Sequence, residues 1–533
     1  MSDPRYITTP IFYVNDKPHI GHVYTSTVCD VYARFQRFAG HDLFFLTGTD
    51  EHGQKVEKSA VARGISPQDL ADENAAVFQR VMADFAISND DFIRTTQPRH
   101  ERQVQSFITQ LLASDAIYLG QFEGWYDEGQ EEYYTETKAK ELDYKSPVSK
   151  KPLTRARENN YYFRLSRFQK SLEELFAQRP DFVQPEARRN EVLGRMREGL
   201  QDVPVSRTNF KWGIPMPNDK AHVVYVWVDA LFNYITALGL GESQDNPQRT
   251  AREKYWPATY HVIGKEILWF HAVIWPAMLM ALKLPLPRCV YAHSFWISEG
   301  QKMSKSLGNF IDQDAMNRYI AAYSLDAFRY YLATQGPLGA TDSDFSASRF
   351  HETYNTDLVN TVGNCASRVT AMIGKYFEGA VPPAGRPSAV AQDFDLRAAA
   401  AKAVDESRQA IEEFDLSTSI AAALSLIRTI DAYINASEPF KVAKDPARRD
   451  ELATILYECI EAVRIASLLL WPAMPAKMQE LWSALNLRIQ PGKDRLADLA
   501  QWGGMNPGTK VVKVALFPRV EQAPAAAPQT ANA

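Results

Sequence analysis

Two histidines, His19 and His22, stand three residues apart with a glycine, Gly21, between them. The residues before them, 6–14 (YITTPIFYV), are rich in β-branched and aromatic types and predict a buried strand. From Ile20 the apolar positions step by three or four, which predicts a helix with both histidines on one face. A helix that begins at the carboxyl end of a parallel strand offers its N-terminus to phosphate groups. The sequence therefore predicts a phosphate site at this point.

An acidic loop is expected shortly after this helix. Gly40 marks the end of the helix, and residues 42–47 (DLFFLT) predict a second strand, which makes a strand–helix–strand unit with parallel strands. Residues 48–53 (GTDEHG) then place Asp50 at the carboxyl end of that strand, where it can hold the ammonium group of a small ligand. A tight turn with a capping aspartate is an equally good interpretation of the loop alone.

Two lysines far along the chain, Lys302 and Lys305, belong to the segment 302–306 (KMSKS). Gly300 and Gly308 flank the segment and would allow it to move. Paired lysines in such a loop suit the neutralisation of a polyphosphate. Alone, the segment is typical of a solvated surface loop, but its occurrence together with the histidine pair argues for one shared site.

The composition excludes several classes of protein. The chain has 533 residues, enough for two to four domains, with 45% hydrophobic and 23% charged residues, a net charge of −5 and a pI near 6.1. This balance argues weakly against a nucleic-acid partner, although a local basic face remains compatible with one. The four cysteines are scattered singly, so neither a zinc knuckle nor a disulfide framework is indicated. We expect no signal peptide and no membrane span, and hence a cytoplasmic protein.

The remaining pattern predicts how these residues are positioned. Residues 65–115 are expected to be helical, and from residue 116 aromatic pairs and a basic stretch indicate a small β-rich insertion. The fold of the insertion should depend on four aromatic residues: Trp125, Tyr126, Tyr133 and Tyr134. Its basic stretch contains Lys145, Lys150, Lys151, Arg155 and Arg157, which fit either a solvated face or a contact with RNA.

Strand and helix signals resume after the insertion. Strands are predicted at 223–228, 259–264 and 289–297, and a helix is predicted to open at Lys265, so the first sheet should continue here. After residue 345 the periodicity predicts a bundle of helices. Within it, residues 510–517 alternate like a strand that packs back on an earlier part of the chain.

The motifs HIGH at 19–22 and KMSKS at 302–306 resemble those of the class I aminoacyl-tRNA synthetases. Further blocks are similar to the methionyl-tRNA synthetase family: ITTPIFYVN before HIGH, FLTGTDEHG after it, VYVWVDA at 224–230, HVIGKEILWFH at 261–271 and NCASR at 364–368. The insertion is too short for the editing domain of the related leucine, isoleucine and valine enzymes. The cysteine enzyme depends on zinc thiolates that this sequence lacks.

The resemblance implies a two-step reaction. The enzyme would activate L-methionine with ATP and Mg²⁺, giving methionyl-adenylate and pyrophosphate. It would then transfer methionine to the 3′ end of initiator and elongator tRNA(Met), for the initiation and elongation of translation. The partners implied are therefore methionine, ATP and tRNA, with no membrane, and the protein is expected to be a monomer.

The resemblance also implies roles for individual residues. The catalytic residues would be His19, Gly21, His22, Lys302 and Lys305, and the ATP-binding residues Gly264, Lys265, Glu266 and Lys305. The methionine-binding residues would be Ile11, Tyr13, Asp50, Trp227, Ala230, Leu231, Tyr234, Ile267 and His271. The anticodon-binding residues would be Asn364, Arg368 and Phe440. For Trp227 and Tyr234, the residues alone favour ordinary core aromatics.

The sequence departs from the family pattern at three places. Glu266 stands where many members have aspartate, and Phe440 stands near the place of a common tryptophan. In the insertion, Asp127 and Gln130 occupy what resembles the first CxxC pair of a zinc knuckle. Because neither the ligand type nor the spacing suits tetrahedral zinc, we expect no bound zinc.

The fold class expected from the resemblance is α/β, with a Rossmann-type parallel-sheet catalytic domain split by the insertion and an α-helical anticodon-binding bundle. The expected boundaries are 1–115 and 221–290 for the catalytic halves, 116–220 for the insertion, 291–345 for the KMSKS and stem-contact region, 346–509 for the bundle, 510–520 for the returning strand and 521–533 for a disordered tail. Two rivals remain: a nucleotidyltransferase of the HIGH type that uses no tRNA, and an inactive relative that only binds RNA or protein.

Overall fold

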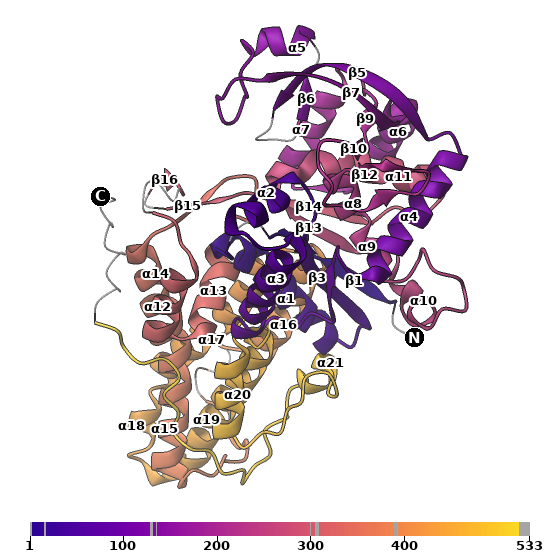
Figure 1. The fold of residues 1–533 in the computed structure, drawn as a ribbon. Helices are drawn as coiled ribbons and strands as arrows, with labels where there is room; N and C mark the ends of the chain where they lie inside the picture. Colours follow the sequence, from indigo (N-terminus) through magenta and orange to yellow (C-terminus); the bar gives the residue numbers. More distant parts are fainter. Residues whose placement is uncertain are drawn as a thin grey trace.

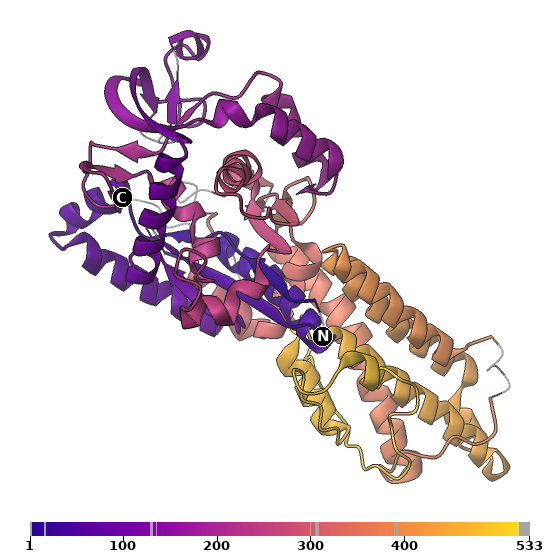
Figure 2. The same cartoon turned by 90° about the vertical axis from the view of Figure 1, so that its right-hand side faces the viewer.

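The computed structural model describes residues 3–14, 17–127, 132–134, 136–298, 300–303, 309–388, 390 and 393–521. The molecule is elongated, with a parallel sheet at its centre, the insertion at one end and a bundle of helices at the other (Figure 1). The view turned by 90° shows the bundle extending away from the sheet (Figure 2). The predicted fold class is confirmed in this arrangement.

The central sheet has seven strands, and every pair in it is parallel. Its order is β2-β3-β1-β13-β14-β8, with β4 beside β3. The bounds are β1 Arg5–Thr8, β2 Phe12–Tyr13, β3 Leu43–Asp50, β4 Asp91–Arg94, β8 Val183–Gln184, β13 Tyr260–Gly264 and β14 Cys289–His293. The predicted strands 6–14, 42–47 and 259–264 are confirmed in type, although 6–14 is broken in two and β3 extends through Asp50.

Alternation along these strands divides the core into two layers. Tyr6 and Phe44 face a first layer, whereas their neighbours Ile7 and Phe45 face a second layer on the opposite side of the sheet. The second layer contains α1 (Ile20–Phe38), α3 (Pro67–Asp84) and α13 (Leu325–Gln335). The first contains α4 (Pro98–Ala113), α8 (Val226–Leu231), α9 (Asn233–Thr236) and α11 (Trp275–Ala281). The sheet is therefore covered by helices on both faces, as parallel sheets require.

The insertion is a second, antiparallel sheet of four strands, as the β-rich pattern predicts. Its order is β6-β5-β7-β9, with bounds β5 Ile117–Asp127, β6 Glu132–Tyr134, β7 Thr154–Phe163 and β9 Val203–Pro204. Trp125 and Tyr126 pair in register with Tyr134 and Tyr133. The helices α5 (Glu136–Glu141), α6 (Gln169–Gln178) and α7 (Glu186–Met196) accompany it, and β8 between α6 and α7 joins the central sheet.

Two predicted strands are wrong. At 223–228, β12 (Asp219–Val224) ends early and α8 begins at Val226; β12 belongs to a small sheet with β10 (Ser206–Arg207) and β11 (Pro215–Met216). A short run that is buried on all sides has no periodicity to separate strand from helix.

At 510–517 there is only an isolated bridge from Lys510 to Ala380. Four of its apolar residues, Val511, Val514, Leu516 and Phe517, are buried against helices, which offer no free strand edge, so the segment packs back without becoming a strand.

A short region connects the sheet to the bundle. The hairpin β15 (Trp296–Ser298) and β16 (Gln301–Lys302) pairs with β17 (Ser343–Phe345), and α12 (Gln313–Tyr323) leads into α13. The predicted strand 289–297 is thus divided between β14 and β15. The expected disordered tail lies outside the described residues, except for Glu521.

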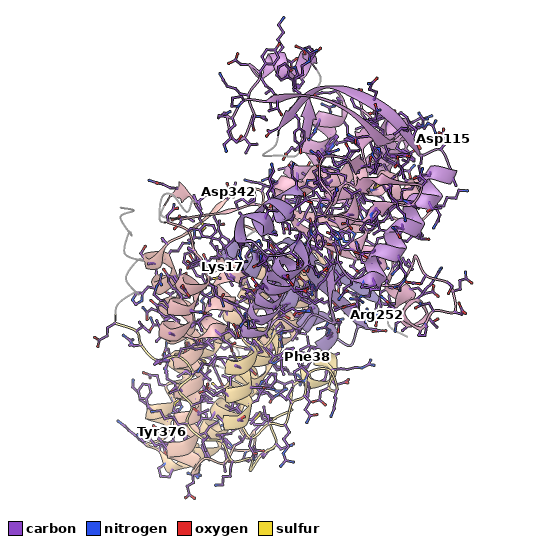
Figure 3. All side chains as sticks on the ribbon, viewed as in Figure 1. Lys17, Phe38, Asp115, Arg252, Asp342 and Tyr376 are labelled. Carbon is purple, nitrogen blue, oxygen red and sulfur yellow. The ribbon has the colours of Figure 1, made fainter. Side chains whose placement is uncertain are left out.

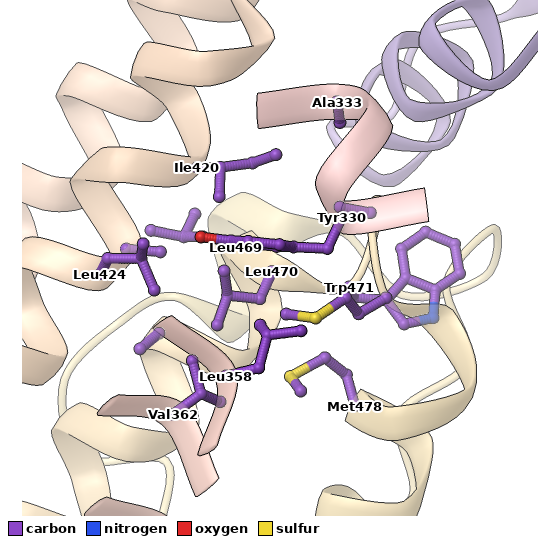
Figure 4. Close-up of a cluster of buried hydrophobic side chains, with 14 of the residues drawn as sticks. Tyr330, Ala333, Leu358, Val362, Ile420, Leu424, Leu469, Leu470, Trp471 and Met478 are labelled. Atoms are coloured by element: carbon purple, nitrogen blue, oxygen red, sulfur yellow. The ribbon is translucent and has the colours of Figure 1, made fainter. Parts of the chain in front are cut away.

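The bundle consists of long helices around one apolar core, as predicted. Its helices are α14 Ala347–Thr353, the π-helical η6 Tyr354–Gly363, α15 Asn364–Phe377, α16 Leu396–Glu412, α17 Leu416–Ser437, α18 Pro439–Val442, α19 Arg449–Leu470, α20 Pro475–Ala484 and α21 Leu496–Leu499. Asp415 caps α17 through the N–H of Thr418, as its position before the helix predicts. Figure 4 shows Tyr330 and Ala333 of α13 beside Leu358, Leu424 and Leu470 in this core. The bundle and the central sheet therefore share one continuous core.

Candidate active site

The two predicted histidines hold the start of α1 by capping each other. His19 is the N-cap, and its Nδ1 accepts a hydrogen bond of 3.0 Å from the Gly21 N–H. The Nδ1 of His22 accepts one of 3.2 Å from the His19 N–H. Burial, with His19 adding to it, lowers the pKa of His22 well below its usual value, so this ring is neutral at pH 7. With Nδ1 occupied as an acceptor, the proton of a neutral ring is on Nε2, which is a hydrogen-bond donor.

Gly21 is needed at this position for a local reason. A Cβ there would lie 2.9 Å from Cε1 of His19, which is closer than the ring can tolerate. The glycine lets the His19 ring fold over the first turn, where it lies 3.8 Å from the His22 ring between centroids. Phe12 and Phe78 pack against the other sides of His22, at 4.9 and 5.2 Å. The pair is thus fixed in place at the N-terminus of the helix.

The segment after KMSKS contacts the HIGH segment directly. The Ile20 N–H donates to the Ile311 carbonyl at 3.0 Å, His19 forms a bridge with Asp312, and the Phe310 ring lies 5.1 Å from that of His19. Lys302 ends the hairpin β15–β16, but its side chain and the whole of Lys305 lie outside the described residues. The chain therefore brings the residues that follow the KMSKS segment against the HIGH segment, as expected if the two segments share one site.

The three predicted ATP-binding residues near β13 lie at the carboxyl end of that strand. A Cβ on Gly264 would lie 2.3 Å from Oε2 of Glu266, so glycine is required for the carboxylate to fold back over the strand end. The Nζ of Lys265 is 2.6 Å from Oδ1 of Asp342 and 4.6 Å from the centre of the Phe295 ring. Asp342, labelled in Figure 3, lies just before β17, so this ion pair joins the central sheet to the hairpin that carries Lys302.

The predicted methionine-binding residues converge on the same end of the sheet. Tyr13 pairs in register with Asp50, and the Val14 N–H donates to the Asp50 carbonyl at 3.1 Å. Six of the apolar and aromatic residues belong to one cluster: Ile11, Tyr13, Trp227, Leu231, Tyr234 and Ile267. Ala230 lies beside them on α8. Asp50 is buried at the end of β3, in register with Tyr13 of this cluster.

The deepest residues of this cluster are uncharged. Tyr234 Oη lies 2.7 Å from Nε2 of His271, and Nδ1 of His271 lies 3.0 Å from the Ile267 carbonyl. Because a carbonyl only accepts, Nδ1 carries the proton and Nε2 accepts from the tyrosine. Burial lowers the pKa of His271 to about 4, so it is neutral at pH 7. The cluster therefore offers aromatic and neutral polar surface, which suits a thioether.

Sequence reasoning missed several residues that build this site. Phe270 stacks on Trp227 at 4.5 Å. Glu51, next to Asp50, accepts two hydrogen bonds from Arg94, at 2.7 and 2.9 Å. Asp342 and Phe310 lie outside the sequence motifs. The paired acids of TDEHG were a usable signal, because adjacent strand residues point to opposite faces and only one of them can face a ligand.

The predicted anticodon residues all belong to helices of the bundle. Arg368 on α15 donates to Asp431 at 3.0 Å and to Asn435 at 3.1 Å, both on α17. Asn364 is exposed one turn earlier on α15. Phe440, the second residue of α18, leaves 49% of its surface exposed. An exposed aromatic ring beside polar side chains is suited to stacking on a base.

The side chains and helices of the described residues bear on metals and membranes. Three or more histidine, cysteine or acidic side chains do not cluster anywhere among them in a way that suits a metal ion. Asp127 is buried on β5, whereas Gln130 lies outside the described part of the chain. None of the described helices is long and apolar enough to cross a membrane.

Comparisons with known proteins agree with this geometry. A family model described as "tRNA synthetases class I (M)" matches residues 5–147 and 137–370, and one described as the anticodon-binding domain of tRNA ligase matches 393–520. The chain is 42% identical over 530 residues to the methionine–tRNA ligase of Halalkalibacterium halodurans, covering 97% of this chain and 78% of that protein. It is 43% identical over 536 residues to that of Streptomyces coelicolor, covering 98% and 97%.

Solved structures give the same result. The methionyl-tRNA synthetase of Mycobacterium tuberculosis in complex with methionyl-adenylate has a TM-score of 0.90 and 37% identity, covering 97% of this chain and 100% of that one. Its apo form has a TM-score of 0.84 and 33% identity, covering 98% and 99%. Identity at this level over nearly the whole length, together with the contact between residues 310–312 and the HIGH segment, shows that the chain belongs to the class I methionyl-tRNA synthetases.

Proposed function

We propose that this chain is a methionine–tRNA ligase, which activates L-methionine with ATP and transfers it to the 3′ end of tRNA(Met). One observation carries the proposal. A single strand–helix–strand unit, β1–α1–β3, holds Asp50 at a strand end and the His19–His22 pair at a helix start. An amino acid and a nucleotide bound at these two points would be adjacent, as attack of a carboxylate on the α-phosphate requires.

In the first step the chain's main contribution is alignment and stabilisation of charge. His19 and His22, whose Nδ1 atoms accept backbone hydrogen bonds, would donate from Nε2 to phosphate oxygens at the positive end of the α1 dipole. Lys265, Lys302 and Lys305 would neutralise the charge on the leaving pyrophosphate. Gly264 and Glu266 would lie along the ribose. Mg²⁺ would accompany ATP and neutralise its phosphates when bound.

Methionine would be held at its two ends by different chemistry. Asp50 would accept hydrogen bonds from the α-ammonium group, since a buried carboxylate favours a cationic partner. Ile11, Tyr13, Trp227, Ala230, Leu231, Tyr234, Ile267 and His271 would surround the side chain. Because His271 is neutral at pH 7, this surface presents no charge that the thioether would have to desolvate.

The bundle would bind the anticodon and so select the tRNA. Asn364 and Arg368 would make polar contacts to bases, and the exposed ring of Phe440 would stack on one of them. We propose that both initiator and elongator tRNA(Met) are charged, that the enzyme is a monomer in the cytoplasm, and that it contains no zinc. The domain boundaries expected from the sequence are retained as part of this proposal.

Pyrophosphate exchange with each of the twenty amino acids tests the first step. We expect exchange with methionine alone, and a loss of at least about 100-fold in Lys305→Ala, the scale for removing one group that stabilises transition-state charge. Lys254→Ala is the matched control, because Lys254 pairs with the exposed Asp42 before β3, at the opposite end of that strand. Faster exchange with another amino acid would overturn the assignment of the substrate.

A separate assay tests the bundle. Phe440→Ala should lower kcat/KM for tRNA charging by about 5- to 150-fold, since stacking on one base contributes about 1–3 kcal/mol. Pyrophosphate exchange, which needs no tRNA, should not change. Val512→Ala removes a comparably exposed apolar side chain (62% exposed) and should leave charging intact. An equal loss in both assays would contradict a role of Phe440 in tRNA binding.

A further inference from the structure

A buried aspartate, Asp229, joins two histidines that come from distant parts of the sequence. Its Oδ2 lies 2.6 Å from Nδ1 of His52, and its Oδ1 lies 2.7 Å from Nε2 of His100. His52 follows β3, His100 is on α4, and Asp229 is on α8. All three side chains are almost fully buried. We call these three residues the Asp229 cluster; none of them is among the residues assigned above to methionine, ATP or tRNA.

The cluster reaches a third element beyond α8. The Nδ1 of His100 lies 2.7 Å from Oγ1 of Thr236, the last residue of α9. Tyr234 is two residues earlier on the same short helix, and Trp227 and Ala230 flank Asp229 on α8. The hydrogen bonds of the cluster therefore connect both helices that supply the proposed walls of the methionine site.

On its other side the cluster connects to the loop that carries Asp50. His52 is two residues from Asp50, and its ring is held edge-on by Trp212 at 5.4 Å. The Nε1 of Trp212 donates to the Glu51 carbonyl at 2.6 Å, while the Glu51 carboxylate is held by Arg94. The loop is thus anchored on both sides of its backbone, and its link to α8 runs through Asp229.

We propose that Asp229 is a positioning residue for methionine, which holds the ammonium-binding loop and the side-chain-binding helices at a fixed separation through His52 and His100. This proposal rests on the proposed function. A small ligand with one charged end and one apolar end depends on that separation, because both ends must be seated together for the carboxylate to reach the phosphate. A misplacement of about 1 Å is enough to cost about 100-fold in rate.

The test is Asp229→Asn, which keeps the size of the side chain but leaves an NH₂ group where one histidine requires an acceptor. In pyrophosphate exchange we expect KM for methionine to rise by about 10- to 100-fold, with KM for ATP unchanged within about twofold. The matched control is Asp30→Asn, another fully buried aspartate, which contacts Arg34 and Arg329 instead of the site. It should leave KM for methionine unchanged even where it lowers stability.

A milder variant keeps the proposal testable if Asp229→Asn does not fold. Thr236→Val is nearly isosteric and removes only the hydroxyl bonded to His100; it should raise KM for methionine by about 2- to 10-fold. The proposal is overturned if KM for methionine is unchanged in the variants that fold, or if KM for ATP rises in parallel. If wild-type protein fails to exchange with methionine, the proposed function itself fails, and the two failures are thereby distinguished.

Discussion

Two buried aspartates, Asp30 and Asp229, each accept hydrogen bonds from two basic side chains, but the bases differ. Asp30 on α1 accepts from Arg329 at 2.6 Å and from Arg34 at 2.7 Å. Asp229 accepts from two histidines. One cluster is therefore built on guanidinium groups, which keep their charge, and the other on imidazole rings.

The two clusters also connect different parts of the molecule. Arg329 on α13 donates to the Phe85 carbonyl at 3.0 Å and to the Pro472 carbonyl at 3.1 Å, as well as to Asp30. It thus joins α1 and the end of α3 to the turn after α19 of the bundle. The Asp229 cluster lies entirely within the catalytic part and touches the proposed methionine site.

The difference shows what each base can do. A guanidinium has five donors in a fixed plane and cannot lose its charge, so Arg329 can satisfy several acceptors at a junction that must persist at every pH. An imidazole has only two nitrogens, so each histidine links one pair of partners. This allows alignment of neighbouring loops and helices but makes the alignment sensitive to protonation.

The largest effect expected from this comparison is that of Arg329→Met. Removing the arginine leaves three buried carbonyls, those of Phe85, Pro472 and Ala473, without this donor, and Asp30 loses one of its two ion pairs. This should lower the free energy of unfolding by about 3–5 kcal/mol. Urea unfolding followed by tryptophan fluorescence measures this, because Trp471 and Trp482 are buried in the adjacent bundle. KM for methionine should not change.

Arg428→Met is the control for that substitution. Arg428 pairs with Asp357 at 3.3 Å, but 57% of its side chain is exposed, and pairs of this kind contribute little to stability. A loss from Arg329→Met as small as that from Arg428→Met would show that the buried junction does not hold the bundle to the sheet.

Arg34→Ala should have an intermediate effect. Arg34 makes the second ion pair to Asp30, and it also donates to the Ala86 carbonyl at 2.7 Å, but 17% of its side chain remains exposed. Arg329 still compensates the carboxylate in this variant. We expect a loss of about 1–2 kcal/mol in the same unfolding experiment, between the buried and exposed limits. A loss equal to that of Arg329→Met would mean that the exposed fraction of the side chain does not determine how much each arginine contributes to stability.

The sequence predicted neither cluster, although His52 and Asp229 lie within two of the motif blocks. Hydrophobic periodicity predicted α1, β3, β13 and the bundle, because those elements are long or strongly patterned. Motif spacing brought His19, His22 and Asp50 to one edge of the sheet. Arg329 and His100 carry no local signal, since an apolar helix with one basic residue has the same pattern whether that residue is buried or exposed.

The same limit explains the errors in the fold. The run 223–228 is buried on every side, so its pattern could not separate the end of β12 from the start of α8. Residues 510–517 alternate because one side faces helices and the other faces solvent, which an extended segment satisfies without strand pairing. In both places tertiary packing, which the local sequence does not contain, decided the outcome.

The smallest expected effect is a difference in pH dependence between the clusters. Burial opposes a charge on His52, but Asp229 more than offsets it, with Glu101 and Glu51 adding to the effect, so the pKa of His52 is raised. Its contribution to stability is then fully present below about pH 6.5 and is lost as the pH rises through the raised value. Burial likewise opposes a charge on Asp30, but Arg329, Arg34 and Ser88 hold its pKa below the usual value. That contribution is present above about pH 4 and is lost only in acid.

Unfolding of wild type, Asp229→Asn and Asp30→Asn between pH 6 and pH 9 separates the two cases. Burial lowers the pKa of His22, His261, His271 and His293, and these residues are common to all three proteins, so their titration cancels from the differences. The stability difference between wild type and Asp229→Asn should shrink as the pH rises, because wild type loses the charged His52 that the variant does not stabilise. The difference for Asp30→Asn should stay constant over this range, since its arginines keep their charge. A constant difference for both variants would show that His52 is not charged in the folded protein. The two clusters would then differ in their location but not in the pH dependence of their contributions to stability.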